Sequence, residues 1–186
     1  MAARAFYTDP FFVHLGPPAF LRNRGLAIFF RAMLRHLGPK ARLVTVRDDQ
    51  DRVVGVAAWV TTGGYPQPIL TQLAQIPGTL RALYRRPRAL VDGQFYLNAI
   101  AKAHPKDEHW YLFLLVADPE FQRRGIGAAL LDDALTLIDE EGVAAYLETQ
   151  KHENLAYYQR FGFTVTDTLT PVKGGPPLYC MRREAR

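Results

Sequence analysis

One stretch of the sequence, DPEFQRRGIGAALL (118–131), has the residue types and spacing of an anion-binding turn. It follows the apolar run WYLFLLVA and leads into helix-like sequence, so several of its backbone N–H groups have no partner within the helix. These N–H groups and the positive end of the helix dipole attract anions. Gly125 and Gly127 carry no Cβ, so a pyrophosphate could approach the backbone, and Arg123 and Arg124 would add positive charge. The alternative is an ordinary turn between a strand and a helix, with solvated arginines.

Several other kinds of chemistry are excluded or have no support. The Walker phosphate loop ends in Gly-Lys-Ser/Thr, which is absent, and GIGAAL lacks the third glycine of the dinucleotide-binding fingerprint. The chain contains no serine, which excludes a serine nucleophile. The single cysteine, Cys180, lies in an apolar stretch typical of a core strand, and the histidines show no metal-ligand spacing. We therefore expect no metal site.

The hydrophobic pattern predicts the elements that must hold this turn. HWYLFLLVAD is a continuous apolar run too short for a typical helix, which indicates a strand covered on both faces. GIGAALLDDALTLIDEEG has leucines on one helical face and ends at Gly142. The predicted ranges are a helix over 17–38, hairpin strands over 42–48 and 52–62, two or three short helices within 66–103, a strand over 109–118, a helix over 125–142, a strand over 144–149, a helix over 153–161, and strands over 163–170 and 177–184. The fold class is therefore α/β, a mixed sheet with helices packed against it.

Length and composition favour one globular domain over residues 1–186, with 48% hydrophobic and 22% charged residues. The net charge of +5 suits a polyphosphate ligand as well as a nucleic acid. No nucleic-acid-binding motif accompanies the basic residues, which include the cluster RALYRRPR (81–88), so we expect no nucleic-acid partner.

No apolar run reaches the length of a membrane span, the N-terminus lacks a signal-peptide pattern, and one cysteine fits a reducing compartment. We therefore expect a cytoplasmic protein without a membrane partner, and leave a homodimer open.

Two segments together resemble a known family. Pro119 and the spacing Gln122-x-x-Gly125-x-Gly127 after an apolar strand resemble the acetyl-CoA-binding motif of the GNAT superfamily of N-acetyltransferases. Downstream, YLETQKHENLAYYQRFGFTV resembles the next strand and helix of that superfamily, with Tyr158 four residues before Gly162. Within the superfamily, the C-terminal third is most similar to the puromycin N-acetyltransferase group. The specific motifs begin near residue 110, and weaker similarity covers nearly the whole chain.

The resemblance implies a GNAT fold, with a mixed, mostly antiparallel central sheet flanked by helices, and acetyl-CoA as the acetyl donor. The family's first strand has no counterpart in the sequence, so either this strand is missing, or the chain starts further upstream, or another element covers the sheet edge. By resemblance, strand 109–118 splays from strand 144–149 and receives the pantetheine arm, and a backbone N–H near its end polarises the thioester carbonyl. The implied cofactor-binding residues are Leu115, Val116, Ala117, Gln122, Arg123, Arg124, Gly125, Ile126, Gly127, Ala128 and Asn154. Val116 and Ala117 depart from the residues usual at their positions. Asn154 could equally be a helix N-cap.

The implied catalytic residues are Tyr158 and Glu148. Tyr158 matches the superfamily's tyrosine near the sulfur and would act as a general acid, although it could instead be a core aromatic residue. Glu148, near the end of its strand, could deprotonate the amine directly or through water, or could be an ordinary exposed carboxylate. His104 and His109 are reserve bases.

The acceptor site is the least defined part of the prediction. Trp59, Tyr65, Tyr96 and Trp110 could line an aromatic cleft for a flat or amphipathic amine, with helix packing as the alternative role. We expect direct transfer of an acetyl group to the primary amine of a small molecule, in a ternary complex. A protein N-terminal or lysine acetyltransferase and a non-catalytic acyl-CoA-binding module are the alternatives.

Overall fold

The computed structural model describes residues 1–16, 18–66, 69–83 and 87–186. Its elements, in chain order, are α1 (Ala2–Ala5), α2 (Pro10–Leu15), α3 (Ala19–Arg35), β1 (Ala41–Arg47), β2 (Val53–Val60), α4 (Ile69–Leu83), α5 (Pro87–Ala103), β3 (His109–Ala117), η1 (Pro119–Phe121), α6 (Ile126–Glu141), β4 (Ala144–Thr149), α7 (Glu153–Gln159), β5 (Thr164–Leu169) and β6 (Leu178–Arg183). None of the helices in these described ranges is long and apolar enough to cross a membrane.

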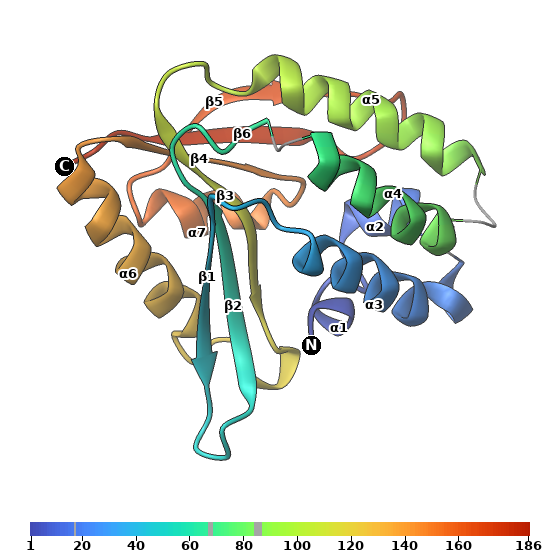
Figure 1. The fold of residues 1–186 in the computed structure, drawn as a ribbon, viewed down its shortest axis with the longest axis horizontal. Coiled ribbons are helices and arrows are strands. Elements are labelled where there is room, and N and C mark those ends of the chain that lie inside the picture. The colour runs from blue at the N-terminus through green and yellow to red at the C-terminus, as the bar shows by residue number, and fades with distance from the viewer. Residues whose placement is uncertain (17, 67–68, 84–86) are drawn as a thin grey trace.

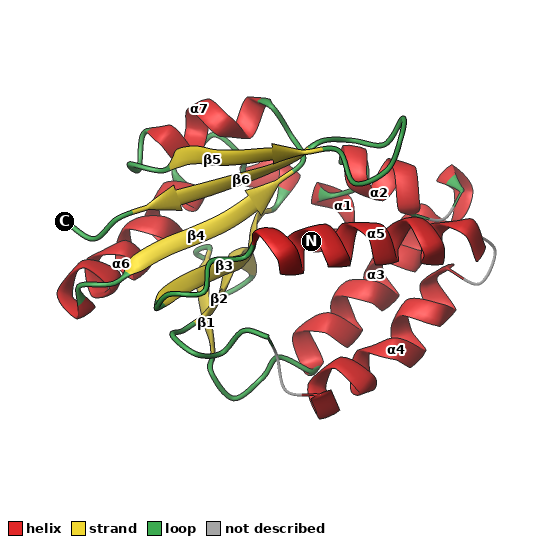
Figure 2. Ribbon diagram, turned by 90° about the horizontal axis from the view of Figure 1, so that it is seen from above, coloured by secondary structure: helices red, strands yellow, loops and turns green. Residues whose placement is uncertain are grey.

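The strands form one six-stranded open sheet in the order β1-β2-β3-β4-β6-β5. Only β3 and β4 pair in parallel, and the other neighbours are antiparallel. Figures 1 and 2 show α6 and α7 over one face of the sheet and α1 to α5 over the other. The predicted fold class, a mixed and mostly antiparallel sheet flanked by helices, is confirmed.

The elements in the second half of the chain match their predicted ranges to within about two residues, the ordinary uncertainty at element ends. The segment 66–103 differs from the prediction of short helices, because α4 has 15 residues and α5 has 17. Pro87 starts α5, where its missing N–H has no helical partner to lose. Pro17, a predicted helix start, and part of the basic cluster at 81–88 lie outside the described residues.

The core is divided between the two faces of the sheet. Beneath α6 and α7, buried side chains from the helices and from β2, β3, β4 and β6 form the largest cluster, which includes Trp59, Trp110 and Leu147. On the opposite face, α3 packs on β2 and β3 through Leu26 and Phe30. Next to that cluster, side chains from α5 pack against a separate group that includes Tyr146 of β4. The two sides of β4 therefore face different environments.

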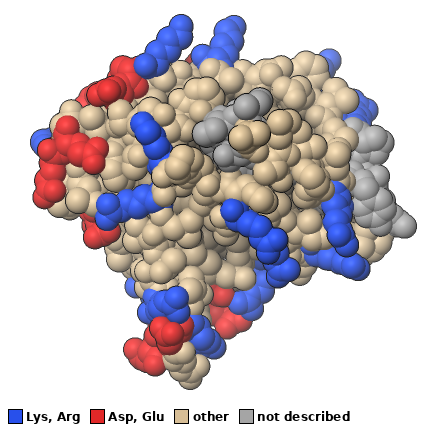
Figure 3. Space-filling model, in the orientation of Figure 1, with Lys and Arg blue, Asp and Glu red and all other residues tan. Residues whose placement is uncertain are grey.

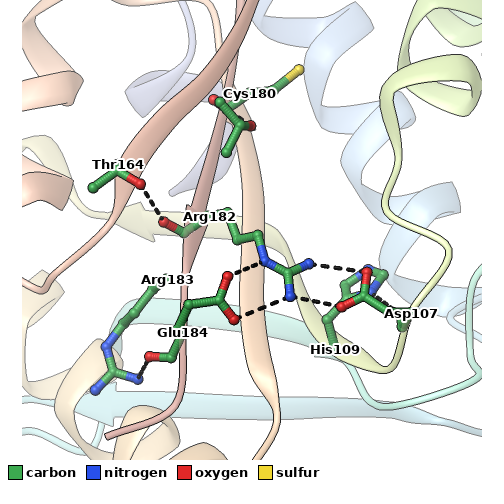
Figure 4. Close-up of polar contacts among 8 residues, drawn as sticks. Asp107, His109, Thr164, Cys180, Arg182, Arg183 and Glu184 are labelled. Atoms are coloured by element: carbon green, nitrogen blue, oxygen red, sulfur yellow. Dashed lines mark hydrogen bonds and ion pairs between the residues drawn. The ribbon is translucent and has the colours of Figure 1, made fainter.

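Arg183 links β6 to α6 through a buried ion pair with Asp139. Its guanidinium donates hydrogen bonds at 2.7 Å to both carboxylate oxygens of Asp139, and its Nε donates to the carbonyl of Phe161 at 2.9 Å. The Arg183 side chain is 4% exposed, so these bonds satisfy a buried charge. Hydrogen bonding from Arg183 lowers the pKa of Asp139 below its ordinary value of 3.8. The neighbouring Arg182, whose partners are exposed, is seen with Arg183 in Figure 4.

We predict that Arg183→Met lowers the free energy of unfolding by about 3 kcal/mol, because it removes one partner of a largely buried ion pair. Arg182→Met, the matched control, should cost about 1 kcal/mol or less, because its partners are exposed. Since the folded-state pKa of Asp139 is depressed, the stabilisation is present above pH 3.8 and is lost as the pH falls below it. Urea unfolding at pH 7 and pH 3 measures both effects. Equal losses for the two variants would contradict the assignment.

Candidate active site

A one-residue bulge in β3 opens the sheet. In the pairing of β2 with β3, Ala58 lies opposite Leu114 and Trp59 lies opposite Leu112, so Phe113 has no partner. On the other side of β3, the parallel pairing with β4 ends at Leu112, opposite Leu147. A bulge bends its strand, and here the bend coincides with the last paired position. Beyond it, β3 pairs only with β2 and β4 pairs only with β6, which leaves a splay between β3 and β4.

The glycine turn lies just beyond β3. Asp118 caps η1, accepting a hydrogen bond from the N–H of Glu120, and Gly125 then precedes α6 with a φ of 81°. Arg123 also has a positive φ, 63°. No side chain caps the N-terminus of α6, so the N–H groups of its first turn remain available to a ligand. Nothing lies within 4 Å of the position that a Cβ on Gly125 would take, so the backbone conformation, which an L side chain rarely adopts, accounts for the glycine.

Gly127 is required for a different reason. A Cβ at this position would lie 2.6 Å from the hydroxyl oxygen of Tyr157, in α7. That hydroxyl is buried and has no hydrogen-bond partner among the described residues. The missing side chain of Gly127 therefore makes room for a tyrosine of the neighbouring helix, and the first turn of α6 packs directly against α7. The sequence had indicated only room for a ligand.

Glu148 is the first residue of β4 beyond its pairing with β3. Its side chain is 4% exposed, and its Oε1 atom lies 3.9 Å from Nδ1 of His104. Oε1 has no hydrogen-bond partner among the described residues. Burial and the negative charge of Glu148 raise the pKa of Tyr111 and of Tyr65, so both hydroxyls stay neutral beside it. Glu148 is therefore a buried carboxylate at the splay, not the exposed strand-end residue that was its alternative.

Tyr158 lies on the other face of β4. Its side chain belongs to the cluster beneath α6, with Leu147 and Phe163, and the residue is 8% exposed. Burial raises its pKa above the ordinary value, so the hydroxyl is protonated at neutral pH. Side chains alternate along a strand, so Leu147 faces the Tyr158 cluster and Glu148 the opposite face. The two predicted catalytic groups thus lie on opposite faces of the sheet.

The four aromatic residues predicted for the acceptor cleft do not come together. Trp59 is fully buried and Trp110 nearly so, both in the core under α6, where their rings meet edge to face. The indole N–H of Trp110 donates to Glu141 at 2.7 Å, away from Glu148. Tyr96 is 1% exposed and donates its hydroxyl hydrogen to the carbonyl of Pro176. We therefore withdraw Trp59, Trp110 and Tyr96 as cleft-lining residues. For Trp110, the uninterrupted apolar run from residue 110 to 117 could not show which face of the sheet its ring occupies.

Tyr65 is the predicted acceptor residue that lies near Glu148. Its ring stacks on His104 with centroids 3.7 Å apart and meets Tyr111 edge to face.

A hollow of about 560 Å³ lies between α2 and the β5–β6 loop. It is lined by Pro10, Val13, His14, Gly174, Gly175 and Pro176. No sequence pattern predicted this hollow, because its walls come from opposite ends of the chain.

Asn154 does not cap α7, whose N-cap residue is His152. Its amide donates to Oγ1 of Thr149, the last residue of β4, at 2.9 Å. At the same end of β4, Lys151 lies 3.6 Å from the buried carboxylate of Asp9 in the turn before α2. Burial raises the pKa of Asp9, against the lowering effect of Lys151. These contacts fix the chain that follows Glu148.

We predict that Gly127→Ala changes stability with opposite signs in two backgrounds. With Tyr157 present, the added Cβ overpacks the hydroxyl and should cost about 1–3 kcal/mol. In the Tyr157→Phe background, the same substitution should stabilise by up to about 1 kcal/mol, because alanine favours the helix. Thermal and urea unfolding of the four proteins of this double-mutant cycle measure the coupling. Additive effects would show that the hydroxyl does not limit the space at Gly127.

The chain is similar in sequence and fold to known acetyltransferases. A family model described as the acetyltransferase (GNAT) family matches residues 4–163. A solved structure described as histone acetyltransferase HPA2 and related acetyltransferase, from Corynebacterium glutamicum, is similar with a TM-score of 0.72 and 22% identity, over 98% of this chain and 86% of that one.

Two further solved structures share the fold. A putative GNAT-family acetyltransferase from Desulfovibrio desulfuricans has a TM-score of 0.51 and 16% identity, over 98% of this chain and 89% of that one. Naa20 from Chaetomium thermophilum, solved with a bisubstrate analogue, has a TM-score of 0.51 and 14% identity, over 99% of this chain and 80% of that one. The structural matches establish the fold, and the family model covers most of the sequence. The chain therefore belongs to the GNAT family of acetyltransferases.

Proposed function

We propose that the protein transfers an acetyl group from acetyl-CoA to the primary amine of a small molecule, by direct attack in a ternary complex. The observation that carries this proposal is the splay between β3 and β4, with the buried carboxylate of Glu148 at its edge on one face of the sheet, while the buried, protonated hydroxyl of Tyr158 belongs to the core cluster on the other face. Amine deprotonation and thiol departure need two such groups on either side of the reacting carbon. No group of His, Cys, Asp or Glu among the described residues could hold a metal ion.

The donor side fits coenzyme A. The N-terminus of α6 is suited to binding a pyrophosphate. Its first turn is uncapped, Gly125 before it is left-handed, and the exposed Arg123 and Arg124 lie next to it in the chain. The edge of β3 beyond Leu112 has no strand partner in the splay, so its backbone N–H groups can donate to an amide-like arm or a thioester carbonyl. Acetyl-CoA supplies the activated acetyl group in this position.

Tyr158 would serve the leaving group. Because burial raises its pKa, the hydroxyl carries its proton at rest but transfers it to a thiolate only at a cost. Its role is therefore to donate a hydrogen bond to the sulfur as negative charge develops. The proton that completes the thiol can come from the nitrogen of the tetrahedral intermediate through the same hydroxyl.

Glu148 would serve the attacking amine. An alkylamine arrives as an ammonium ion and must lose a proton before it can attack. The carboxylate is the charged group at the splay on this face, and the surrounding side chains of Tyr65, Tyr111 and Tyr146 are aromatic. A buried carboxylate between aromatic rings suits the ammonium group of a small organic molecule.

The acceptor class distinguishes the proposal from its main alternative. The side chain of Glu148 is 4% exposed and lies among the aromatic rings of Tyr65, Tyr111 and Tyr146, and such enclosed aromatic surroundings suit a small-molecule acceptor. The structure described as histone acetyltransferase HPA2 and related acetyltransferase shares the fold, so a protein acceptor is the alternative. Figure 3 shows Lys and Arg scattered over one face of the molecule, and on that face they do not gather into the single patch expected of a nucleic-acid-binding surface.

A thiol-release assay tests the proposed activity with acetyl-CoA and a panel of aminonucleosides, aminoglycosides, polyamines and peptides. We expect turnover with a small amine, and expect Glu148→Gln to lower kcat by about 100-fold or more, as for loss of a general base. Tyr158→Phe should lower kcat by about 10- to 100-fold with little change in the KM for acetyl-CoA. Coenzyme A binding without turnover would support the non-catalytic alternative, and turnover confined to peptides would support a protein acceptor.

A matched pair of glycine variants tests the coenzyme A site. Gly125 and Gly142 flank α6, both have positive φ, and neither has an atom within 4 Å of its Cβ position. Gly125→Ala and Gly142→Ala should therefore each cost about 1–2 kcal/mol of stability through backbone strain. Only Gly125→Ala should weaken coenzyme A binding, measured by calorimetry. Equal affinities of the two variants for coenzyme A would place the pyrophosphate elsewhere.

A further inference from the structure

Two histidines lie end to end behind Glu148. His104 is at the end of α5 and His109 is the first residue of β3, and each is 8% exposed. Their Nε2 atoms are 2.9 Å apart, the length of a hydrogen bond. Nδ1 of His109 lies 2.7 Å from the carbonyl oxygen of Asp107. Nδ1 of His104 faces Glu148 Oε1 at 3.9 Å, and neither atom has a hydrogen-bond partner among the described residues.

The contacts determine which nitrogens carry hydrogen when both rings are neutral. A carbonyl oxygen only accepts, so Nδ1 of His109 must donate to Asp107. The Nε2 of neutral His109 is then bare and accepts, which requires Nε2 of His104 to donate. The Nδ1 of neutral His104 is therefore bare as well. One proton acceptor is left open along this line, and it faces the carboxylate that we propose as the base.

The surroundings of His109 favour its uncharged form. Burial lowers the pKa of His109 below 6.5. The neighbouring ionisable side chains on this face cannot compete for a proton at neutral pH, because burial raises the pKa of each phenol and of the thiol. These groups are Tyr65 before α4, Tyr111 on β3, Tyr146 on β4 and Cys180 on β6. At the far end, the half-exposed carboxylate of Asp107 is paired with Arg182, as Figure 4 shows.

We propose that His104 and His109 form a relay that takes the acceptor's proton from Glu148 and carries it to the Asp107 end of the molecule. This inference rests on the proposed acetyl transfer. The two histidines act through Glu148 and do not touch the acceptor. The relay explains why these two histidines form a buried hydrogen-bonded pair in which the nitrogen without a partner, Nδ1 of His104, faces the base.

The proton balance is complete. The ammonium acceptor gives one proton to the Glu148 carboxylate, which passes it to Nδ1 of His104. The Nε2 hydrogen of His104 then moves to Nε2 of His109, leaving neutral His104 and an imidazolium at His109. This imidazolium releases its Nδ1 proton to water near Asp107, which leaves hydrogen on Nε2 of His109 and Nδ1 of His104. Tautomer exchange of both neutral rings must then restore the starting arrangement before the next turnover. The second nitrogen proton ends on the leaving thiol, so each turnover releases one proton in all. Transfer to His104 requires Glu148 to approach by about 1 Å, because hydrogen bonds to nitrogen are near 2.9 Å.

Acceptors of different basicity test the relay. His104→Gln keeps an N–H donor near Nε2 of His109 and removes the titratable ring. With an alkylamine, which is an ammonium ion at neutral pH, kcat should fall by up to about 100-fold, as for impaired base catalysis, with an unchanged KM for acetyl-CoA. With an O-alkylhydroxylamine, which is already neutral, kcat should change little. Equal losses with both acceptors would mean a structural role and would overturn the relay.

The pH profile gives a second readout. Because the relay needs neutral His109, wild-type kcat with the alkylamine should fall as the pH drops through the lowered pKa of His109. This limb should disappear in His104→Gln and persist in the control His36→Gln. His109→Asn keeps an N–H toward Asp107 and replaces His104→Gln as the test if that variant does not fold. It should likewise lower kcat with the alkylamine and change kcat little with the O-alkylhydroxylamine. A variant profile identical to wild type would overturn the proposal.

Nitrogen-15 NMR of the histidine rings tests the arrangement without activity. In the protein without acetyl-CoA, His109 should carry hydrogen on Nδ1 and His104 on Nε2. The opposite tautomer at His104 would overturn the relay even in an active enzyme. Absence of turnover with every amine would refute the proposed function and the relay with it, whereas turnover that His104→Gln leaves unchanged would refute the relay alone.

Discussion

The pairing between β3 and β4 can continue only while β3 keeps its pleat, and the bulge at Phe113 ends it. Everything proposed for the site follows from that interruption. Had the parallel ladder continued in register, Phe113 would have lain opposite Glu148, and the facing backbone edges of the two strands would have been occupied by hydrogen bonds to each other. With the ladder ended, these edges become available to a ligand while β2 and β6 still hold each strand firmly. The opening therefore has rigid walls.

The divided core gives the two sides of the reaction separate surroundings. The face under α6 and α7 holds Tyr158 in an apolar cluster. The opposite face holds Glu148 among polar aromatic rings, with two histidines behind it. The sheet itself thus separates the hydroxyl proposed to serve the leaving sulfur from the carboxylate proposed to take the proton of the amine. A single-faced pocket would bring both into one hydrogen-bond network, where their protons could exchange.

The extent to which the sequence predicted this site depends on how local each feature is. The strand, glycine turn and helix around residues 109–142 were predictable, because apolar periodicity and a left-handed glycine are local properties. The bulge was not, because the strand is apolar at every position from Trp110 to Ala117 and has no alternation that a slipped residue would disturb. The same uniformity hid which ring of Trp110 and Tyr111 faces which side. The contact of His104 with His109 depends on how the chain turns between α5 and β3, and single-residue properties do not report it.

Two adjacent tyrosines in α7 also show that the sequence alone does not reveal which neighbour a helical side chain will contact. Tyr157 and Tyr158 are adjacent, and their side chains point about 100° apart because a helix has 3.6 residues per turn. One packs against Gly127 and the other into the core beneath α6. The resemblance selected Tyr158, while the contact of Tyr157 with α6 became visible only when both helices were placed.

The strand order also governs how the sheet can be completed during synthesis. β6 lies between β4 and β5, yet it follows both in the chain. Until residues 178–183 have left the ribosome, β4 has an open edge on that side and β5 has no neighbour in the sheet. The nascent chain therefore passes through a stage in which an apolar strand edge is uncovered, a state prone to pairing with other chains. The strand that closes the sheet also brings Arg183 to Asp139, so closure and fastening to α6 occur in one step.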